Sequence, residues 1–73
     1  MYFVLTRNNC VWCDKAKQLL EEKGEAYQAS SLEDNPLLIE LMKKADLKTV
    51  PQIWEDAEHI GGYTELERKL NAR

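Results

Sequence analysis

The spacing of apolar residues in the first half of the chain predicts a strand, a helix and a second strand. Residues 2–6 are a short apolar run of strand-forming side chains. From about residue 11 to residue 23 the apolar positions follow helical spacing, and Gly24 is the expected C-terminal stop. Residues 26–29 predict a weak second strand. The inner face of the helix is expected to carry Ala16, Leu19 and Leu20.

A second amphipathic helix is predicted in the middle of the chain. A polar connection at residues 30–35 leads to Pro36, which suits the first turn of a helix because its missing N–H has no acceptor there. Apolar residues then recur at helical spacing and form one stripe. The stripe consists of Leu38, Leu41, Met42 and Ala45.

The last third of the chain predicts a hairpin and a final helix. Residues 51–54 read as a third strand, and a tight turn at residues 55–56 leads to a short fourth strand that ends near Ile60. Two glycines then interrupt the chain. Thr64-x-x-Glu67 has the spacing of a capping box, and Leu66 and Leu70 give the following helix an apolar face.

The predicted order of elements is βαβαββα, which indicates the α/β class. A right-handed crossover between the first two strands makes them parallel neighbours. The expected architecture is a small mixed sheet flanked by helices.

Length and charge exclude several kinds of protein. The chain has 73 residues, enough for one domain, and 44% of them are hydrophobic. Its net charge of −3, with acidic and basic residues interleaved, argues against nucleic acid as a partner. No apolar run approaches the roughly 20 residues that span a membrane. The start of the chain shows no export signal, so we expect a cytoplasmic protein.

The pair Cys10-Val11-Trp12-Cys13 is the main candidate for chemistry. It lies between the first strand and the first helix and contains both cysteines of the chain. Cys10 is thus expected at a helix N-terminus, where free N–H groups and the helix dipole favour an anion such as a thiolate. Cys13, one turn later, is within reach to resolve a mixed disulfide on Cys10. The motif predicts thiol–disulfide exchange.

A structural zinc site is the alternative for this motif, and the composition disfavours it. Such a site needs four ligands, usually from two cysteine pairs. The chain offers one pair and a single histidine, His59. We interpret His59 as a strand-end residue and Trp54 as a core residue, and we expect no metal site. A Cys-x-x-Cys pair near a βαβ pattern is typical of a thioredoxin-like redox site.

Two further segments gain meaning beside the cysteine pair. In Thr49-Val50-Pro51, a cis Val50–Pro51 bond would expose the backbone of Val50 to a peptide-like substrate; without the cysteines, this proline would only mark the start of a strand. The segment Gly61-Gly62-Tyr63-Thr64-Glu65 is explained by a turn before a helix. Its helix N-terminus also suits the carboxylate of a small ligand.

With these three motifs in this order and spacing, the chain resembles a glutaredoxin. The resemblance covers essentially the whole chain, and its compactness is similar to that of small bacterial or phage glutaredoxins. It implies a single glutaredoxin domain over residues 1–73. The implied fold is thioredoxin-like, a four-stranded mixed sheet flanked by three helices.

The resemblance also implies roles for individual residues. Cys10 matches the nucleophile and Cys13 the resolving cysteine. The other matching positions bind glutathione, which would be a co-substrate, with no tightly bound cofactor. Arg7 and Lys48 would bind its glycyl carboxylate, and Trp12 would form an aromatic wall. The backbone of Val50, before the cis residue Pro51, would pair with the cysteinyl part. The γ-glutamyl carboxylate would be received by Gly62, Thr64 and Glu65.

Three positions depart from the usual pattern of the family. Val11 replaces the common proline between the cysteines, which restores a backbone N–H and leaves the redox potential open. Some glutaredoxins without that proline bridge an iron–sulfur cluster between two chains. Glu65 stands where Asp is commoner, and Trp12 where Tyr is commoner.

The sequence therefore predicts a dithiol glutaredoxin, expected to be monomeric. It would reduce protein disulfides and glutathione mixed disulfides, and ribonucleotide reductase is the client that the resemblance implies. A glutaredoxin-like redoxin, reduced by thioredoxin reductase instead of glutathione, is the nearest alternative. A dimer that carries a [2Fe–2S] cluster is an alternative of another class.

Overall fold

The computed structural model describes residues 1–72, and this part of the chain contains four strands and three helices in the predicted order βαβαββα. The elements are β1 (Tyr2–Thr6), α1 (Val11–Glu22), β2 (Tyr27–Ser31), α2 (Leu37–Lys44), β3 (Gln52–Glu55), β4 (Glu58–Gly61) and α3 (Tyr63–Asn71). The predicted α/β architecture, a four-stranded mixed sheet with three helices, is confirmed.

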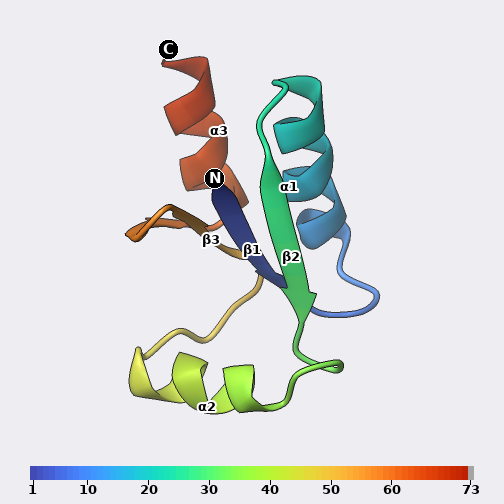
Figure 1. Cartoon of the computed structure of the whole chain (residues 1–73), viewed down its shortest axis with the longest axis vertical. Helices are drawn as coiled ribbons and strands as arrows, with labels where there is room; N and C mark the ends of the chain where they lie inside the picture. Colours follow the sequence, from blue (N-terminus) through green and yellow to red (C-terminus); the bar gives the residue numbers. More distant parts are fainter. Residues whose placement is uncertain (73) are drawn as a thin grey trace.

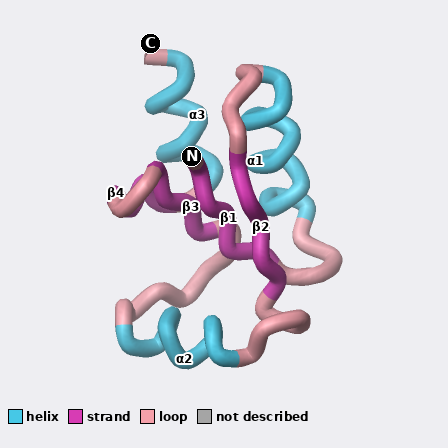
Figure 2. The backbone as a smooth tube through the Cα atoms, viewed as in Figure 1, coloured by secondary structure: helices cyan, strands magenta, loops and turns pink. Residues whose placement is uncertain are grey.

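The four strands form one sheet in the order β2-β1-β3-β4 (Figures 1 and 2). β1 pairs with β2 in parallel and with β3 antiparallel, and β3 pairs antiparallel with β4. Parallel neighbours need a long crossover, which α1 supplies. Because β1 and β3 are antiparallel, the end of β1 lies beside the start of β3, where Leu5 is paired with Gln52.

The core lies between the sheet and the helices α1 and α3, which run side by side in Figure 1. Val4, Leu20 and Ile53 are fully buried at its centre. Burying each such side chain contributes about 1.5–3 kcal/mol, so this layer supplies most of the driving force for folding. The other buried members of the cluster are Tyr2, Ala16, Leu66 and Leu70.

The helix α2 lies at the end of the molecule opposite the two termini (Figure 1) and packs loosely. Only Met42 is buried among its residues. The predicted apolar stripe of α2 does face the sheet, but across an open apolar hollow of about 210 Å³. The hollow is lined by Leu38, Leu41, Met42 and Ala45 of the stripe, by Phe3, Leu5 and Trp54 of the sheet, and by Leu47.

Three predicted boundaries were wrong. The third strand was predicted over residues 51–54 but spans Gln52–Glu55, because Glu55 pairs with Tyr2 of β1. β2 continues to Ser31, whereas residues 30 and 31 were assigned to the connection; parallel pairing with Leu5 and Thr6 of β1 extends the strand despite its polar composition. The last helix is not capped by Thr64 and Glu67. It begins at Tyr63 after the N-cap residue Gly62, because two glycines let the chain turn into the helix earlier.

The end of α1 agrees with the prediction. Gly24 has φ +70°, the left-handed conformation expected after a helix. Its N–H donates to the carbonyl of Glu21, and the N–H of Glu25 donates to that of Leu20. These two bonds form a Schellman motif, which satisfies carbonyls that the helix itself leaves unpaired.

None of the helices in residues 1–72 combines the length and apolar character needed to cross a membrane.

We expect Gly24→Ala to lower the free energy of unfolding by about 1 kcal/mol. The cost comes from the backbone alone, since a Cβ at this position meets no atom within 4 Å. Urea unfolding monitored by circular dichroism would measure it. Gly24→Asn is the matched control and should cost less, because Asn tolerates φ > 0 better than Ala. Equal stability of the wild type and Gly24→Ala would contradict this account.

Candidate active site

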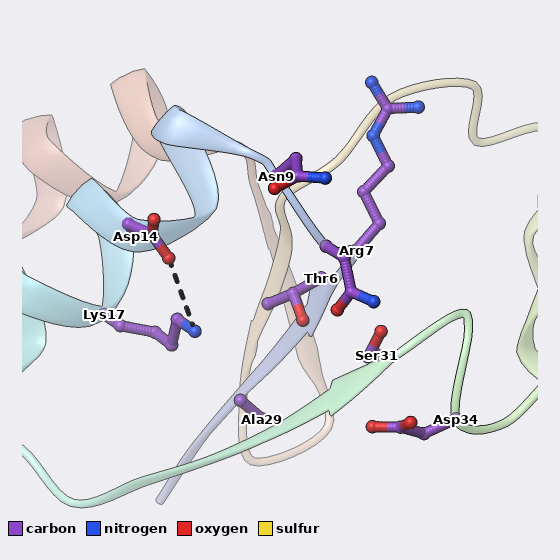
Figure 3. A pocket seen from close by; sticks show the side chains of 9 residues that line it. Thr6, Arg7, Asn9, Asp14, Lys17, Ala29, Ser31 and Asp34 are labelled. Atoms are coloured by element: carbon purple, nitrogen blue, oxygen red, sulfur yellow. Dashed lines mark ion pairs between the residues drawn. The ribbon is translucent and has the colours of Figure 1, made fainter.

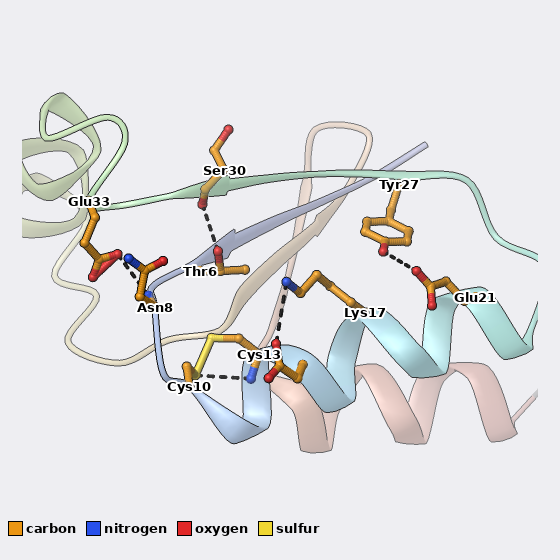
Figure 4. Close-up of polar contacts among 10 residues, drawn as sticks. Thr6, Asn8, Cys10, Cys13, Lys17, Glu21, Tyr27, Ser30 and Glu33 are labelled. Carbon is orange, nitrogen blue, oxygen red and sulfur yellow. Dashed lines mark hydrogen bonds and ion pairs between the residues drawn. A yellow bond between two sulfur atoms is a disulfide. The ribbon is translucent and has the colours of Figure 1, made fainter.

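The cysteine pair lies where β1 passes into α1, as predicted. Cys10 is the N-cap residue of α1, with an extended backbone, and its Sγ accepts a hydrogen bond of 3.1 Å from the N–H of Cys13. The two sulfurs form a disulfide, with the Cα atoms 5.2 Å apart (Figure 4). In the reduced protein, that N–H and the positive end of the α1 dipole would stabilise a thiolate on Cys10.

The two cysteines differ in exposure. Cys13 is 1% exposed, whereas Cys10 is partly accessible at the surface. An incoming disulfide can therefore reach the sulfur of Cys10 but not that of Cys13. This asymmetry agrees with Cys10 as nucleophile and Cys13 as resolving cysteine.

The loop before Cys10 is held by a carboxylate that the sequence did not reveal. Glu33 accepts a hydrogen bond of 2.6 Å from the Ser31 hydroxyl. It accepts another of 3.0 Å from the N–H of Asn8 (Figure 4). These bonds, with the nearby charge of Arg7, hold the pKa of Glu33 below its ordinary value. Ser31-x-Glu33 at the end of a strand is the local signal, but only the fold brings Asn8 to it. The loop then ends with Asn9 at φ 56°, a conformation that Asn tolerates.

The ammonium group of Lys17 is paired with a carboxylate on the same helix. It lies 3.6 Å from the Asp14 carboxylate, one turn earlier on α1 (Figure 3). Asp14 and Lys17 line a broad polar hollow of about 630 Å³, which the loop at residues 7–9 also borders (Figure 3). Arg7 also borders this hollow, but its guanidinium group points away from Ser31 and Asp34. No cysteine lines this hollow.

Two smaller hollows form the candidate substrate groove. The first, of about 260 Å³, is lined by Trp12, Thr49, Val50, Pro51, Gly62, Tyr63, Thr64 and Glu65. The second, of about 250 Å³, is lined by Arg7, Leu32, Met42, Lys48, Thr49 and Val50. They share Thr49 and Val50, and the name groove refers to the two hollows together. The groove contains all eight residues that the sequence singled out for glutathione; their binding of it stays a prediction.

The peptide bond between Val50 and Pro51 is cis, as the resemblance to glutaredoxins implied. Pro51 is buried and Val50 is partly exposed beside the groove. Within residues 1–72, no hydrogen bond uses the N–H of Val50. This N–H is therefore a donor available to a ligand.

Trp12 forms the aromatic wall of the groove and is 54% exposed. Its ring lies 5.3 Å from that of Tyr63, and the Lys15 ammonium group lies 4.6 Å from its centre on α1. Contacts with an aromatic ring and with a cation both stabilise an exposed indole in one orientation. The sequence analysis suggested no role for Tyr63 or Lys15. The contact between Trp12 and Tyr63 depends on the fold. Lys15, in contrast, follows Trp12 by three residues on α1, a spacing that brings two side chains together on a helix.

The other end of the groove is the N-terminus of α3. Glu65 reaches back and accepts a hydrogen bond of 2.8 Å from the N–H of Gly62. Gly61 has φ +125°, and a Cβ there would lie 2.7 Å from the Glu65 carboxylate, so this turn requires glycine. The first intrahelical bond runs from Leu66 to Gly62. The N–H groups of the preceding turn have no acceptor within the helix and suit an anion.

The comparisons identify the family. The family model described as Glutaredoxin matches residues 1–60. Glutaredoxin 3 of Escherichia coli K12 is 39% identical over 64 residues, which cover 86% of this chain and 77% of that protein. The chain belongs to the glutaredoxin family.

Solved structures agree with this assignment. Glutaredoxin 1 from Francisella tularensis, complexed with cacodylate, superposes with a TM-score of 0.84 at 33% identity, over 97% of this chain and 92% of that one. The glutaredoxin-like NrdH-redoxin from Escherichia coli shares the fold, with a TM-score of 0.83 at 20% identity, over 97% and 91% of the two chains.

This glutaredoxin is a glutathione-dependent thiol–disulfide oxidoreductase whose active dithiol is Cys10 and Cys13. Residues 1–72 contain no group of three or more His, Cys, Asp or Glu side chains placed to hold a metal ion. The iron–sulfur alternative would instead use Cys10 from each of two chains together with glutathione.

In the reduced protein, we expect iodoacetamide to alkylate Cys10 and to leave Cys13 unmodified, because only Cys10 is accessible. Peptide mapping by mass spectrometry would locate the label. Cys10→Ser should then abolish all activity, whereas Cys13→Ser should retain much of the reduction of glutathione mixed disulfides. Equal inactivation by both substitutions would show that the two roles are assigned wrongly.

Proposed function

We propose that residues 1–73 act as one monomeric domain that binds glutathione along the groove and transfers it through Cys10. The observation that carries the proposal is the charge pattern of the groove. Cationic side chains lie at one end, a helix N-terminus lies at the other, and Val50 lies between them. Glutathione has a carboxylate at each end and a thiol in the middle, so its charges and length of chain suit this pattern.

The γ-glutamyl end of glutathione carries a carboxylate and an ammonium group. The free N–H groups at the start of α3 suit the carboxylate. The Glu65 side chain cannot receive a carboxylate, because it is itself an anion. We assign it to the ammonium group, which it can accept while it keeps its bond to the N–H of Gly62.

The glycyl carboxylate at the other end fits between Arg7 and Lys48, which line the second hollow. Both side chains come from loops: Arg7 follows β1 and Lys48 precedes the cis peptide. An exposed ion pair of this kind adds about 1 kcal/mol or less. The two charges therefore orient glutathione more than they hold it.

The cysteinyl part would lie over Val50, where the free N–H offers a hydrogen bond to its backbone. Trp12 closes the side of the groove, supported by the ring of Tyr63. This arrangement would bring the sulfur of glutathione toward the exposed Cys10.

The reaction follows from these positions. The Cys10 thiolate attacks the glutathione sulfur of a mixed disulfide, a new S–S bond joins Cys10 to glutathione, and the client leaves as a thiolate. A second glutathione thiolate then attacks the same sulfur, which yields glutathione disulfide and restores the Cys10 thiolate. Alternatively, Cys13 attacks Cys10 and releases glutathione, and two glutathione molecules reduce the resulting disulfide.

We extend the proposal to protein disulfides, which Cys10 would attack and Cys13 would resolve. Ribonucleotide reductase is the client that family membership suggests. A cytoplasmic location would suit this chemistry, because the cytosol keeps glutathione reduced.

We expect the oxidised protein to be reduced rapidly by NADPH, glutathione and glutathione reductase, and only slowly by NADPH and thioredoxin reductase. The groove offers both ends of glutathione a partner, which explains the expected preference. Consumption of NADPH at 340 nm, followed in parallel reactions, would measure both routes. Turnover with thioredoxin reductase alone would keep the cysteine roles but remove glutathione, in favour of a redoxin.

We expect Glu65→Gln to raise the KM for a glutathione mixed disulfide by about five- to tenfold, with little change in kcat, because one charge-assisted hydrogen bond is lost. Gln can still accept from the N–H of Gly62, so α3 should keep its start. Steady-state kinetics with the mixed disulfide of glutathione and 2-mercaptoethanol would measure the effect. Glu40→Gln, on α2 and outside the groove, is the matched control. An unchanged KM in Glu65→Gln would exclude this role.

A further inference from the structure

Gln52 is a buried amide next to the active site, and its role is not explained by the chemistry of the cysteines. It is the first residue of β3 and is 6% exposed. A buried amide is costly unless each polar atom has a partner. Both ends of this side chain do have one.

The nitrogen of Gln52 holds Thr49. Its Nε2 donates to the carbonyl oxygen of Thr49 at 2.9 Å and to the Thr49 hydroxyl at 3.2 Å. Thr49 lines both hollows of the groove. One amide group thus fixes the backbone and the side chain of the residue that precedes Val50.

Holding the Thr49 carbonyl also sets the direction of the Val50 N–H. The two groups belong to the same peptide unit, which is planar and trans. In such a unit, the C=O and the N–H point in opposite directions. Because Gln52 binds the oxygen from the sheet side, the N–H is directed away from Gln52, and no group in residues 1–72 accepts from it.

The oxygen of Gln52 is held in turn by His59. His59 Nε2 lies 2.8 Å from Gln52 Oε1. An amide oxygen only accepts, so this ring nitrogen must carry a proton, as it does in one neutral tautomer and in the imidazolium form. The bond therefore fixes which way the Gln52 amide faces.

A bulge in β4 brings His59 to this position. Ile53 pairs with Gly61 but its neighbour Trp54 pairs with His59, so Ile60 is an extra residue. The His59 ring then lies 4.9 Å from the ring of Trp54, which limits its orientation.

We propose that Gln52 and His59 are positioning residues for the substrate. They aim the Val50 N–H at the backbone of the disulfide-bearing substrate through the chain His59, Gln52, Thr49. The inference rests on the proposed function for the identity of the substrate, but it applies to any substrate with a peptide backbone. It assigns a role to two residues that contact neither sulfur.

The test compares variants that remove either the whole Gln52 amide or only its bond to His59. Gln52→Met removes the whole amide, with its two bonds to Thr49 and its bond to His59, at similar volume. His59→Phe keeps a ring against Trp54 but removes the donor, and His59→Gln restores a donor. Gln28→Met, the same exchange at an exposed position of β2, is the matched control.

We expect Gln52→Met and His59→Phe to raise the KM for the glutathione mixed disulfide by about fivefold or more, with kcat within about twofold of the wild type. The rate at which iodoacetamide alkylates Cys10 should not change, because the Cys10 thiolate does not depend on Thr49. His59→Gln and Gln28→Met should resemble the wild type. In the glutathione mixed disulfide of Cys13→Ser, the Val50 amide proton should shift downfield, and Gln52→Met should reduce that shift.

Three results would overturn the proposal. The first is an unchanged KM in Gln52→Met and His59→Phe. The second is a parallel loss of kcat and of Cys10 alkylation, which would indicate general distortion of the site. The third is failure of His59→Gln to rescue. If Gln52→Met does not fold, the comparison of His59→Phe with His59→Gln decides.

The proposed function can fail separately from this inference. In that case the wild type would accept electrons only from thioredoxin reductase. The same KM comparison would then be made with a protein disulfide as substrate and thioredoxin reductase as the electron source. A raised KM in His59→Phe, rescued in His59→Gln, would support positioning without glutathione.

Discussion

The antiparallel pairing of β1 with β3 brings the separate parts of the active site together. β1 ends at Thr6 and leads to Cys10, whereas β3 starts at Gln52 directly after the cis peptide. Antiparallel neighbours place the end of one strand beside the start of the other. Cys10 and Val50 are 40 residues apart in the chain. This pairing places the ends of β1 and β3 that lead to them at the same end of the sheet, and Trp12 of the cysteine motif lines one hollow with Val50. Val4 of β1 and Ile53 of β3 are paired and fully buried in the core on one face of the sheet, which stabilises the register between these two strands.

The sequence was sufficient to predict the elements and the chemistry. Apolar spacing indicated the helices and strands. Gly24 marked the end of α1, because glycine adopts without strain the left-handed conformation in which the last carbonyls of a helix find donors. The cysteine pair indicated thiol chemistry, because its position between a strand and a helix can be predicted from the sequence alone. The groove itself was predicted only through family resemblance. Nothing in the spacing of Arg7, Val50 and Thr64 says that they meet.

Contacts made by tertiary structure explain the failures. β2 is longer than its composition suggests, because hydrogen bonds to β1 compensate for poor strand-forming residues. The capping pair of α3 was predicted as Thr64 and Glu67, but it is Gly62 and Glu65, which have the same spacing. The turn at Gly61 starts the helix early enough for the second pair to form. Glu33 was missed for a related reason. Its partner Asn8 is 25 residues away in the chain, so no local sequence pattern predicts this hydrogen bond.

The two faces of the sheet carry different kinds of constraint. The face toward α1 and α3 is packed with apolar side chains, whose attraction has no direction and tolerates small shifts. The face toward α2 borders an open apolar hollow. Beside the active site this face also contains Gln52, whose hydrogen bonds to Thr49 and His59 require a particular geometry. A buried amide adds little net stability compared with an apolar side chain of the same size. What it adds is direction, because its donor and acceptor must each face a particular atom. That is the property a disulfide reductase needs next to Cys10, where a substrate backbone must be held at one angle while two sulfur atoms exchange.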